Sequence, residues 1–181
     1  MTVLVWGPEF DELFRSFTSS AVRLETRQVY TTDEEREPLR RFLAGESVPL
    51  DWFEPWVGDV STATGAGREF RRVRVFTEPL PDYLRFELWV CQYNAAAGED
   101  IRYLHADRAA DLNLPDYDYW LFDDEHLALM YFTDEGTPLG AQLVTDPAVV
   151  RSHSRWLEQA TANAIPYERF AADHPVVAVA G

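Results

Sequence analysis

The sequence is short of cysteine, of basic residues and of long apolar runs. Cys91 is the single cysteine among 181 residues, so no disulfide can form within the chain. Its neighbours Trp89 and Val90 indicate a small buried apolar residue, and nothing near it in the sequence resembles an activating base. No run of about 18 apolar residues and no signal-peptide pattern is present, which favours a cytoplasmic protein without a membrane span.

Basic residues are outnumbered by acidic ones. The sequence has 16 Lys and Arg residues against 31 Asp and Glu residues, and its formal net charge is −15. A chain with this charge repels phosphate backbones and anionic lipid surfaces. We therefore expect no direct binding to nucleic acid and none to a membrane.

Familiar catalytic and cofactor motifs are absent as well. The sequence contains no GxSxG, Walker A, GxGxxG or HExxH pattern, and none of its four histidines has a second histidine four residues away. His153 lies on the apolar face of a predicted helix and is most simply a core histidine. The acidic run from Asp116 to Glu125 matches no calcium-binding loop and is more simply a solvated turn. We expect no metal and no cofactor.

The most informative segment is 71–104, RRVRVFTEPLPDYLRFELWVCQYNAAAGEDIRYL. It predicts a strand around Val73 and Val75, a helix that begins near Asp82, a stop at Gly98 and a second strand. A strand–helix–strand unit of this length predicts a parallel pair with a right-handed crossover.

The remaining periodicity predicts a helix after Pro8, a weak strand in 22–30 and a second helix opened by a Thr32–Glu35 capping box. Later segments predict a helix broken by Pro55, three hairpin-linked strands and a last helix capped by Asp146. The fold class is α+β, with a mixed sheet of about five strands covered by helices. We expect one domain over 1–170, with a helical portion 1–67, a mixed portion 68–170 and a loose tail 171–181.

Polar residues within the predicted helix of 82–97 indicate a site. Glu87 and Asn94 lie opposite its solvent face, and a carboxylate in an apolar stripe needs a partner. Neighbouring strands offer arginines as that partner. The arrangement is either a structural ion pair or part of a ligand- or partner-binding site, for which the candidates are Arg72, Arg74, Glu78, Tyr83, Glu87, Asn94, Glu99, Arg102 and Asp123.

A family resemblance rests on four segments, AVRLETRQVY, RRVRVFTEPLPDYLRFEL, NAAAGEDIRYL and DYWLFDD. From about Phe10 to Phe170 the chain resembles an actinobacterial family with a domain of unknown function. The genes of that family commonly lie beside genes for WhiJ-type helix-turn-helix regulators. The resemblance implies a regulatory context and brings no catalytic residues with it.

A second likeness concerns the fold. The half that contains DYWLFDDEHLALMYF is similar to half of a phospholipase D-like domain. The catalytic pattern HxKxxxxD of that fold is not met, because the lysine after His105 is absent and position 112 is Leu. The likeness implies a scaffold without its phosphodiesterase chemistry.

Two functional hypotheses follow. The first is a non-catalytic accessory protein that binds a partner, such as a helix-turn-helix regulator, or a small ligand. The second is a hydrolase or phosphodiesterase-like enzyme that uses Glu87, Asn94 and Arg102. Burial of these residues without a cavity favours the first hypothesis, whereas a concave pocket in which Glu87 meets a histidine or a second carboxylate favours the second.

Overall fold

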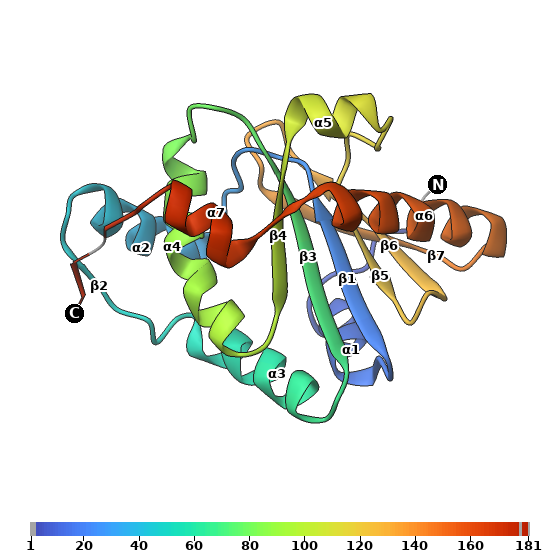
Figure 1. The fold of residues 1–181 in the computed structure, drawn as a ribbon. Helices are drawn as coiled ribbons and strands as arrows, with labels where there is room; N and C mark the ends of the chain where they lie inside the picture. Colours follow the sequence, from blue (N-terminus) through green and yellow to red (C-terminus); the bar gives the residue numbers. More distant parts are fainter. Residues whose placement is uncertain (1–2, 178, 181) are drawn as a thin grey trace.

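The computed structural model describes residues 3–177 and 179–180 of the chain. In this part, seven strands form one sheet in the order β7-β6-β5-β1-β3-β4-β8, and helices cover both of its faces (Figure 1). The strands of this sheet are β1 (Ser20–Glu25), β3 (Glu69–Phe76), β4 (Asp100–His105), β5 (Tyr119–Phe122), β6 (His126–Phe132), β7 (Pro138–Val144) and β8 (Ile165–Pro166). The α+β class with a mixed sheet is confirmed.

The centre of the sheet is parallel and one side of it is a meander. β1 pairs parallel with β3, and β3 pairs parallel with β4. β5, β6 and β7 follow as antiparallel neighbours beyond β1. The predicted parallel pair and the predicted hairpins are therefore confirmed.

Helices lie on both faces of the sheet. The described helices are α1 (Pro8–Ser16), α2 (Asp33–Leu43), α3 (Glu54–Gly65), α4 (Asp82–Ala96), α5 (Ala106–Asp111), α6 (Pro147–Asn163) and α7 (Tyr167–Asp173). Val150 and Leu157 of α6 pack with Leu24 and Val73 on one face. Helices α1, α3 and α4 lie on the opposite face (Figure 1). None of the described helices combines the length and the hydropathy that a membrane span requires.

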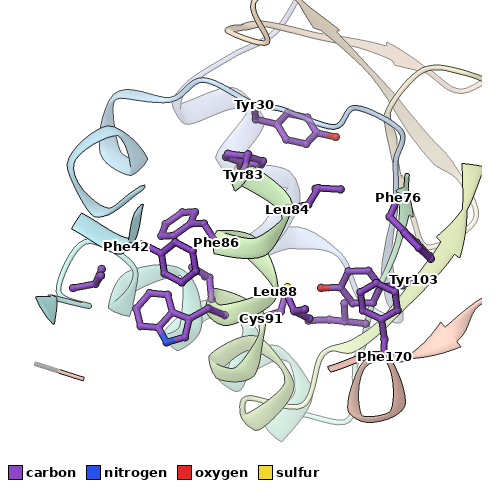
Figure 2. Packing of buried hydrophobic residues seen from close by; sticks show 14 residues of the cluster. Tyr30, Phe42, Phe76, Tyr83, Leu84, Phe86, Leu88, Cys91, Tyr103 and Phe170 are labelled. Atoms are coloured by element: carbon purple, nitrogen blue, oxygen red, sulfur yellow. The ribbon is translucent and has the colours of Figure 1, made fainter. Parts of the chain in front are cut away.

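Helix α4 is the most deeply buried helix and joins two parts of the core. Figure 2 shows Phe86 on one side of α4 beside Phe42 of α2, while Leu84 and Cys91 face the side of Tyr103 and Phe170. Residues Arg85, Gln92 and Ala96 are exposed, as the helical periodicity predicts. The Cys91 thiol is buried, and burial raises its pKa to about 11, so it is an apolar packing group.

The turn after α4 requires glycine. Gly98 has a φ of 96°, a conformation that residues with a side chain rarely adopt. A Cβ atom at this position would lie 2.9 Å from the hydroxyl oxygen of Thr64 in α3. That hydroxyl donates a hydrogen bond of 2.6 Å to the carbonyl of Ala97. The close packing of α3 on the end of α4 therefore depends on the predicted stop residue.

Several expectations need correction. The N-terminal portion 1–67 contains β1, a central strand of the sheet, so its residues are inseparable from the rest of the core. Pro55 lies in the first turn of α3 and opens that helix, because its missing N–H has no partner there in any case. Thr32 occupies the N-cap position of α2, but its side chain makes no capping hydrogen bond.

The predicted loose tail is also partly structured. Its first residues belong to α7, and Phe170 of that helix is buried. Val179–Ala180, named β9, pairs parallel with β2 (Ser47–Val48) in a separate small sheet. Residues 178 and 181 of the expected tail lie outside the described residues.

Candidate functional site

Alternation along two central strands places charged side chains on one face of the sheet. In β1, Val22 and Leu24 face α6, so Arg23 and Glu25 face the opposite side, toward α1 and α4. In β3, Val73 faces α6 and Arg72 and Arg74 face the other way. The register pairs Arg23 with Arg72 and Glu25 with Arg74, which brings four charges together.

Glu25 is the centre of this group. Its Oε1 accepts a hydrogen bond of 2.9 Å from Arg72 and lies 3.0 Å from a guanidinium nitrogen of Arg23. Its Oε2 accepts a bond of 2.6 Å from Arg74. Burial opposes ionisation of Glu25, but the three guanidinium groups outweigh it and hold its pKa well below the usual range.

Helix α4 adds the residues that the sequence predicts to be buried. Arg74 donates a hydrogen bond of 2.7 Å to Oε2 of Glu87. Arg74 is 1 % exposed and Glu87 is 7 % exposed, so the predicted buried pair is confirmed and its arginine is identified. Beside it, Arg72 donates a bond of 2.8 Å to Glu99, which also accepts a hydrogen bond from Asn94.

Asp118 closes the other end of the group. Its carboxylate accepts a hydrogen bond of 2.8 Å from the backbone N–H of Thr26 and another from the Tyr30 hydroxyl, and it lies 3.4 Å from Arg23. We call these residues the ion-pair network: Arg23, Glu25, Arg72, Arg74, Glu87, Asn94, Glu99 and Asp118. Its four carboxylates exceed its three guanidinium groups, so the network is an acidic cluster in the interior.

A cleft of about 640 Å³ opens above the network, between α1, α3 and the start of α2. Four members of the network line it: Arg23, Glu25, Arg72 and Glu87. Its walls hold ten aromatic residues of the described chain, namely Trp6, Phe10, Phe14, Tyr30, Trp52, Phe53, Trp56, Tyr83, Trp120 and Phe132. A second hollow of about 420 Å³ near Tyr117 and Tyr131 is lined by eight residues, so the cleft is the better candidate site.

The aromatic walls are packed against one another. The ring of Phe14 lies edge-on to those of Trp56 and Trp120, with centroids 5.3 Å and 4.9 Å away. The Arg23 guanidinium lies over the rings of Tyr30 and Trp120, at 5.5 Å and 5.4 Å from their centroids. Contacts of this kind restrict both the rings and the cation. The cleft therefore has a shape that exists without an occupant.

Glu35 of α2 brings a second carboxyl group to Glu87. Tyr83 donates a hydrogen bond of 2.9 Å to Oε2 of Glu35, and the rings of Tyr83 and Tyr30 lie near one another at the start of α4 (Figure 2). Burial and the charge of Glu87 raise the pKa of Glu35, whereas Tyr83 and Arg74 lower it, and the net result is a pKa of about 8. Near neutral pH, Glu35 therefore holds a proton beside the Arg74-paired carboxylate of Glu87.

The other predicted site residues lie elsewhere. Glu78 accepts or shares a proton with His174 at 2.7 Å, at the end of α7. Arg102 binds Asp100 and faces the α6 side of the sheet, where it also donates to the Thr161 carbonyl. Asp123 accepts hydrogen bonds from the backbone N–H groups of 18–20 and so ties β5 to the start of β1. The structure thus separates Arg102 and Asp123 from Glu87.

His153 lies on the far side of the sheet from the cleft. His153 is buried in α6, and its two ring nitrogens bind the Val149 carbonyl and the Tyr117 hydroxyl. This is the core histidine that the helical periodicity predicts. Among residues 3–177 and 179–180, no three His, Cys, Asp or Glu side chains are grouped for metal binding.

Four residues of the site are missed by the sequence prediction: Arg23, Glu25, Glu35 and Asp118. The sequence predicts a solvated turn around Asp118, but this carboxylate is buried. Arg23 and Glu25 lie in VRLETRQ, where charge at every second position resembles an exposed strand. Glu35 resembles a helix cap. The clustered tryptophans Trp52 and Trp56 were the available signal, because large aromatic residues beside a helix start often line a cavity.

Among solved structures, the chain is similar to TrmBL2, an archaeal chromatin protein that shows a novel mode of DNA binding. The two share 12 % identity with a TM-score of 0.45, and the match covers 87 % of this chain. It covers 48 % of the archaeal protein, so this chain spans about half of its length. No curated protein matches the sequence. The family model of a domain of unknown function, DUF6879, matches residues 8–172, and the chain therefore belongs to that family.

Proposed function

We propose that this protein is a cytoplasmic, non-catalytic accessory protein that binds a small organic molecule in the aromatic cleft. The observation that carries the proposal is a preformed cleft of about 640 Å³ with aromatic walls and a charged floor. Cavities of small-molecule sites have this size, and they combine apolar walls with a few convergent polar groups.

Burying the ion-pair network costs desolvation free energy, and this cost supports a role in ligand binding. Buried ion pairs seldom stabilise a fold more than apolar residues of the same volume would. Here Arg72, Glu25 and Glu87 are each less than a tenth exposed, and each still reaches the wall of the cleft. Polar groups that are held rigidly at the floor of a cavity give a ligand a fixed orientation.

Ligand binding is testable through the tryptophans. A metabolite library is titrated against the protein while tryptophan fluorescence and melting temperature are recorded. We expect a ligand that changes the fluorescence and raises the melting temperature, because Trp6, Trp52, Trp56 and Trp120 line the cleft. In W56A we expect the affinity of that ligand to fall about tenfold or more.

The matched control is W156A. Trp156 lies on α6 and packs edge-on against His153, on the far side of the sheet from the cleft. This variant should bind the same ligand with unchanged affinity. A ligand whose affinity falls equally in both variants binds somewhere else and counts against the cleft.

We propose further that the ligand-bound protein acts on a helix-turn-helix regulator. This step rests on the resemblance to the actinobacterial family whose genes lie beside those of WhiJ-type regulators, and the phospholipase D-like likeness adds only a scaffold without catalysis. A net charge of −15 accelerates encounter with a basic protein at low salt and disfavours contact with DNA.

The expected result of a gel-shift experiment follows from this charge. The protein alone should not shift duplex DNA, but it should change the DNA binding of the neighbouring regulator, and the change should weaken as salt rises. Tight DNA binding by this chain alone would contradict the proposal. So would a regulator whose binding is unaffected at every salt concentration.

A second candidate function is an enzyme, a hydrolase or phosphodiesterase-like one. The observation in its favour is that Glu87 and a second carboxyl group, Glu35, line the same concave cleft, where the charge of Glu87 acts on Glu35. A protonated carboxyl beside an ionised one is the usual acid and base pair of hydrolases. Arg102 is not part of it, since it lies on the other face of the sheet. Turnover of the bound ligand that is lost in both E35Q and E87Q would favour the enzyme.

A further inference from the structure

We propose that the cleft binds an organic cation, an amine or related nitrogen base carried on an aromatic or other planar body. The inference rests on the proposed ligand-binding function and names the class of ligand. Three features of the cleft favour such a ligand: its free hydrogen-bond acceptors, its aromatic walls and the ion pairs that its arginines already form.

The arginines of the floor already form ion pairs, although Nε of Arg23 has no hydrogen-bond partner among the described residues. Arg23 pairs with Glu25 and Asp118, and Arg72 pairs with Glu25 and Glu99. A ligand carboxylate or phosphate would have to displace these partners, and each displaced carboxylate would then be buried without a cation. The floor therefore does not favour an anion.

The carboxylates of the cleft, by contrast, still have oxygen atoms that can accept a hydrogen bond from a ligand. Oε2 of Glu87 accepts from Arg74, but no donor in the described part of the chain binds its Oε1. Oε2 of Glu35 accepts from Tyr83, and the side chain of Thr32 also acts on this carboxyl group through a hydrogen bond. Six acidic residues and three arginines line the cleft, so its charge balance favours a cation even before Glu35 ionises: Asp11, Glu25, Glu34, Glu35, Asp59 and Glu87 against Arg15, Arg23 and Arg72.

The aromatic walls suit the same ligand. Cations are attracted to the faces of aromatic rings, and tryptophan is the strongest partner. Four tryptophans line the cleft, and Trp52 and Trp56 lie on the α3 side of it. The planar body of the ligand would pack between such rings while its nitrogen approaches Glu87 and Glu35.

Binding of a cation should release a proton from Glu35. The titratable and charged groups that face Glu35 are Glu87 and Tyr83 from α4 and Arg74 from β3, with Thr32 at the start of its own helix. A cation placed between Glu35 and Glu87 favours the ionised form of Glu35 and offsets the repulsion of Glu87. The affinity should therefore rise from pH 6 to pH 8.5, with the release of about one proton near neutral pH.

The test is calorimetric titration of the full chain with three probes of similar shape: 2-phenylethylamine, 2-phenylethanol and phenylacetate. We expect the amine to bind at least about tenfold more tightly than the alcohol, and phenylacetate to bind most weakly. Titrations of the amine in phosphate and in Tris buffer measure the proton release. E35Q should lose that release and about tenfold in amine affinity, while its affinity for the alcohol is unchanged.

The possible outcomes separate the inference from the proposed function. If phenylacetate or the alcohol binds as tightly as the amine and W56A abolishes that binding, the cleft is a ligand site and the cation inference is overturned. If the amine shows no binding at millimolar concentration, the inference is overturned as well. If in addition no compound of the library is sensitive to W56A, the proposed function fails with it.

Discussion

R74M should lose about 3–5 kcal/mol of unfolding free energy, a large part of the stability of an ordinary domain. Arg74 is 1 % exposed and pairs with Glu25 at 2.6 Å and with Glu87 at 2.7 Å. Methionine fills a similar volume but leaves two buried carboxylates with one fewer cation. Urea unfolding, followed by circular dichroism and by tryptophan fluorescence, measures the loss.

The matched control is R85M on the exposed face of α4, the helix that carries Glu87, the partner of Arg74. Arg85 pairs with Asp82 at 3.4 Å, and its side chain is 49 % exposed, so this variant should change the stability by about 0.5 kcal/mol or less. The double variant R74M/E87Q should recover part of the loss, because it removes one of the orphaned carboxylates. Equal losses in R74M and R85M would show that the network does not hold the core together.

That Glu87 is buried and pairs with an arginine could be predicted from the sequence, although the sequence left Arg72, Arg74 and Arg102 as alternatives. Helical periodicity places Glu87 in an apolar stripe, and a buried carboxylate needs a cation. The adjacent strand offers arginines at Arg72 and Arg74. Strand alternation then places both arginines on the face of the sheet that α4 covers, because Val73 between them faces the opposite side.

Arg102 shows where this reasoning stops. It lies on β4, the strand next to β3, and the sequence alone predicts it as an equally good partner for the Glu87 carboxylate. The register pairs Arg102 with Val73, so its side chain points to the α6 side. A shift of one residue in register would reverse that direction, and strand patterns do not fix the register between two parallel strands.

The cleft as a whole could not be predicted from local patterns. Asp118 lies 92 residues from Thr26, its hydrogen-bonding partner, and no local signal links the two. Glu35 occupies the position of a capping residue, and only the packing of α2 against α4 directs its carboxyl group toward Tyr83. Contacts between distant segments decided both positions.

Glu35 should make the protein less stable as the pH rises from about 4.5 to about 8. Its pKa is about 8 in the folded protein, against 4.5 for the ordinary side chain, because burial and the charge of Glu87 disfavour its ionised form. In this window the folded state binds more protons at Glu35 than the unfolded state does. The unfolding free energy therefore falls with pH, at no more than about 1.4 kcal/mol per pH unit.

E35Q should remove this dependence. Glutamine keeps the shape of the protonated carboxyl at every pH, so E35Q and the natural protein should be similarly stable near pH 5. At pH 9 the variant should be the more stable by roughly 2–4 kcal/mol, with allowance for the solvent that reaches the cleft. Urea unfolding at intervals between pH 5 and pH 9 gives the difference curve.

The difference between the two proteins isolates Glu35 from the histidines. Burial lowers the pKa of His153. For His174 burial acts in the same direction, but the hydrogen bonds that its ring makes to Glu78 and to the Phe170 carbonyl, with the nearby acidic charges, outweigh it and raise the pKa. Both histidines are present in both proteins, so their contributions cancel. E34Q removes an exposed carboxylate from the same turn of α2 and should give a nearly flat difference curve. A curve for E35Q that is equally flat would mean that Glu35 is ionised near neutral pH. The Glu35–Glu87 pair would then repel an anion even more strongly, but it could no longer release a proton when a cation binds.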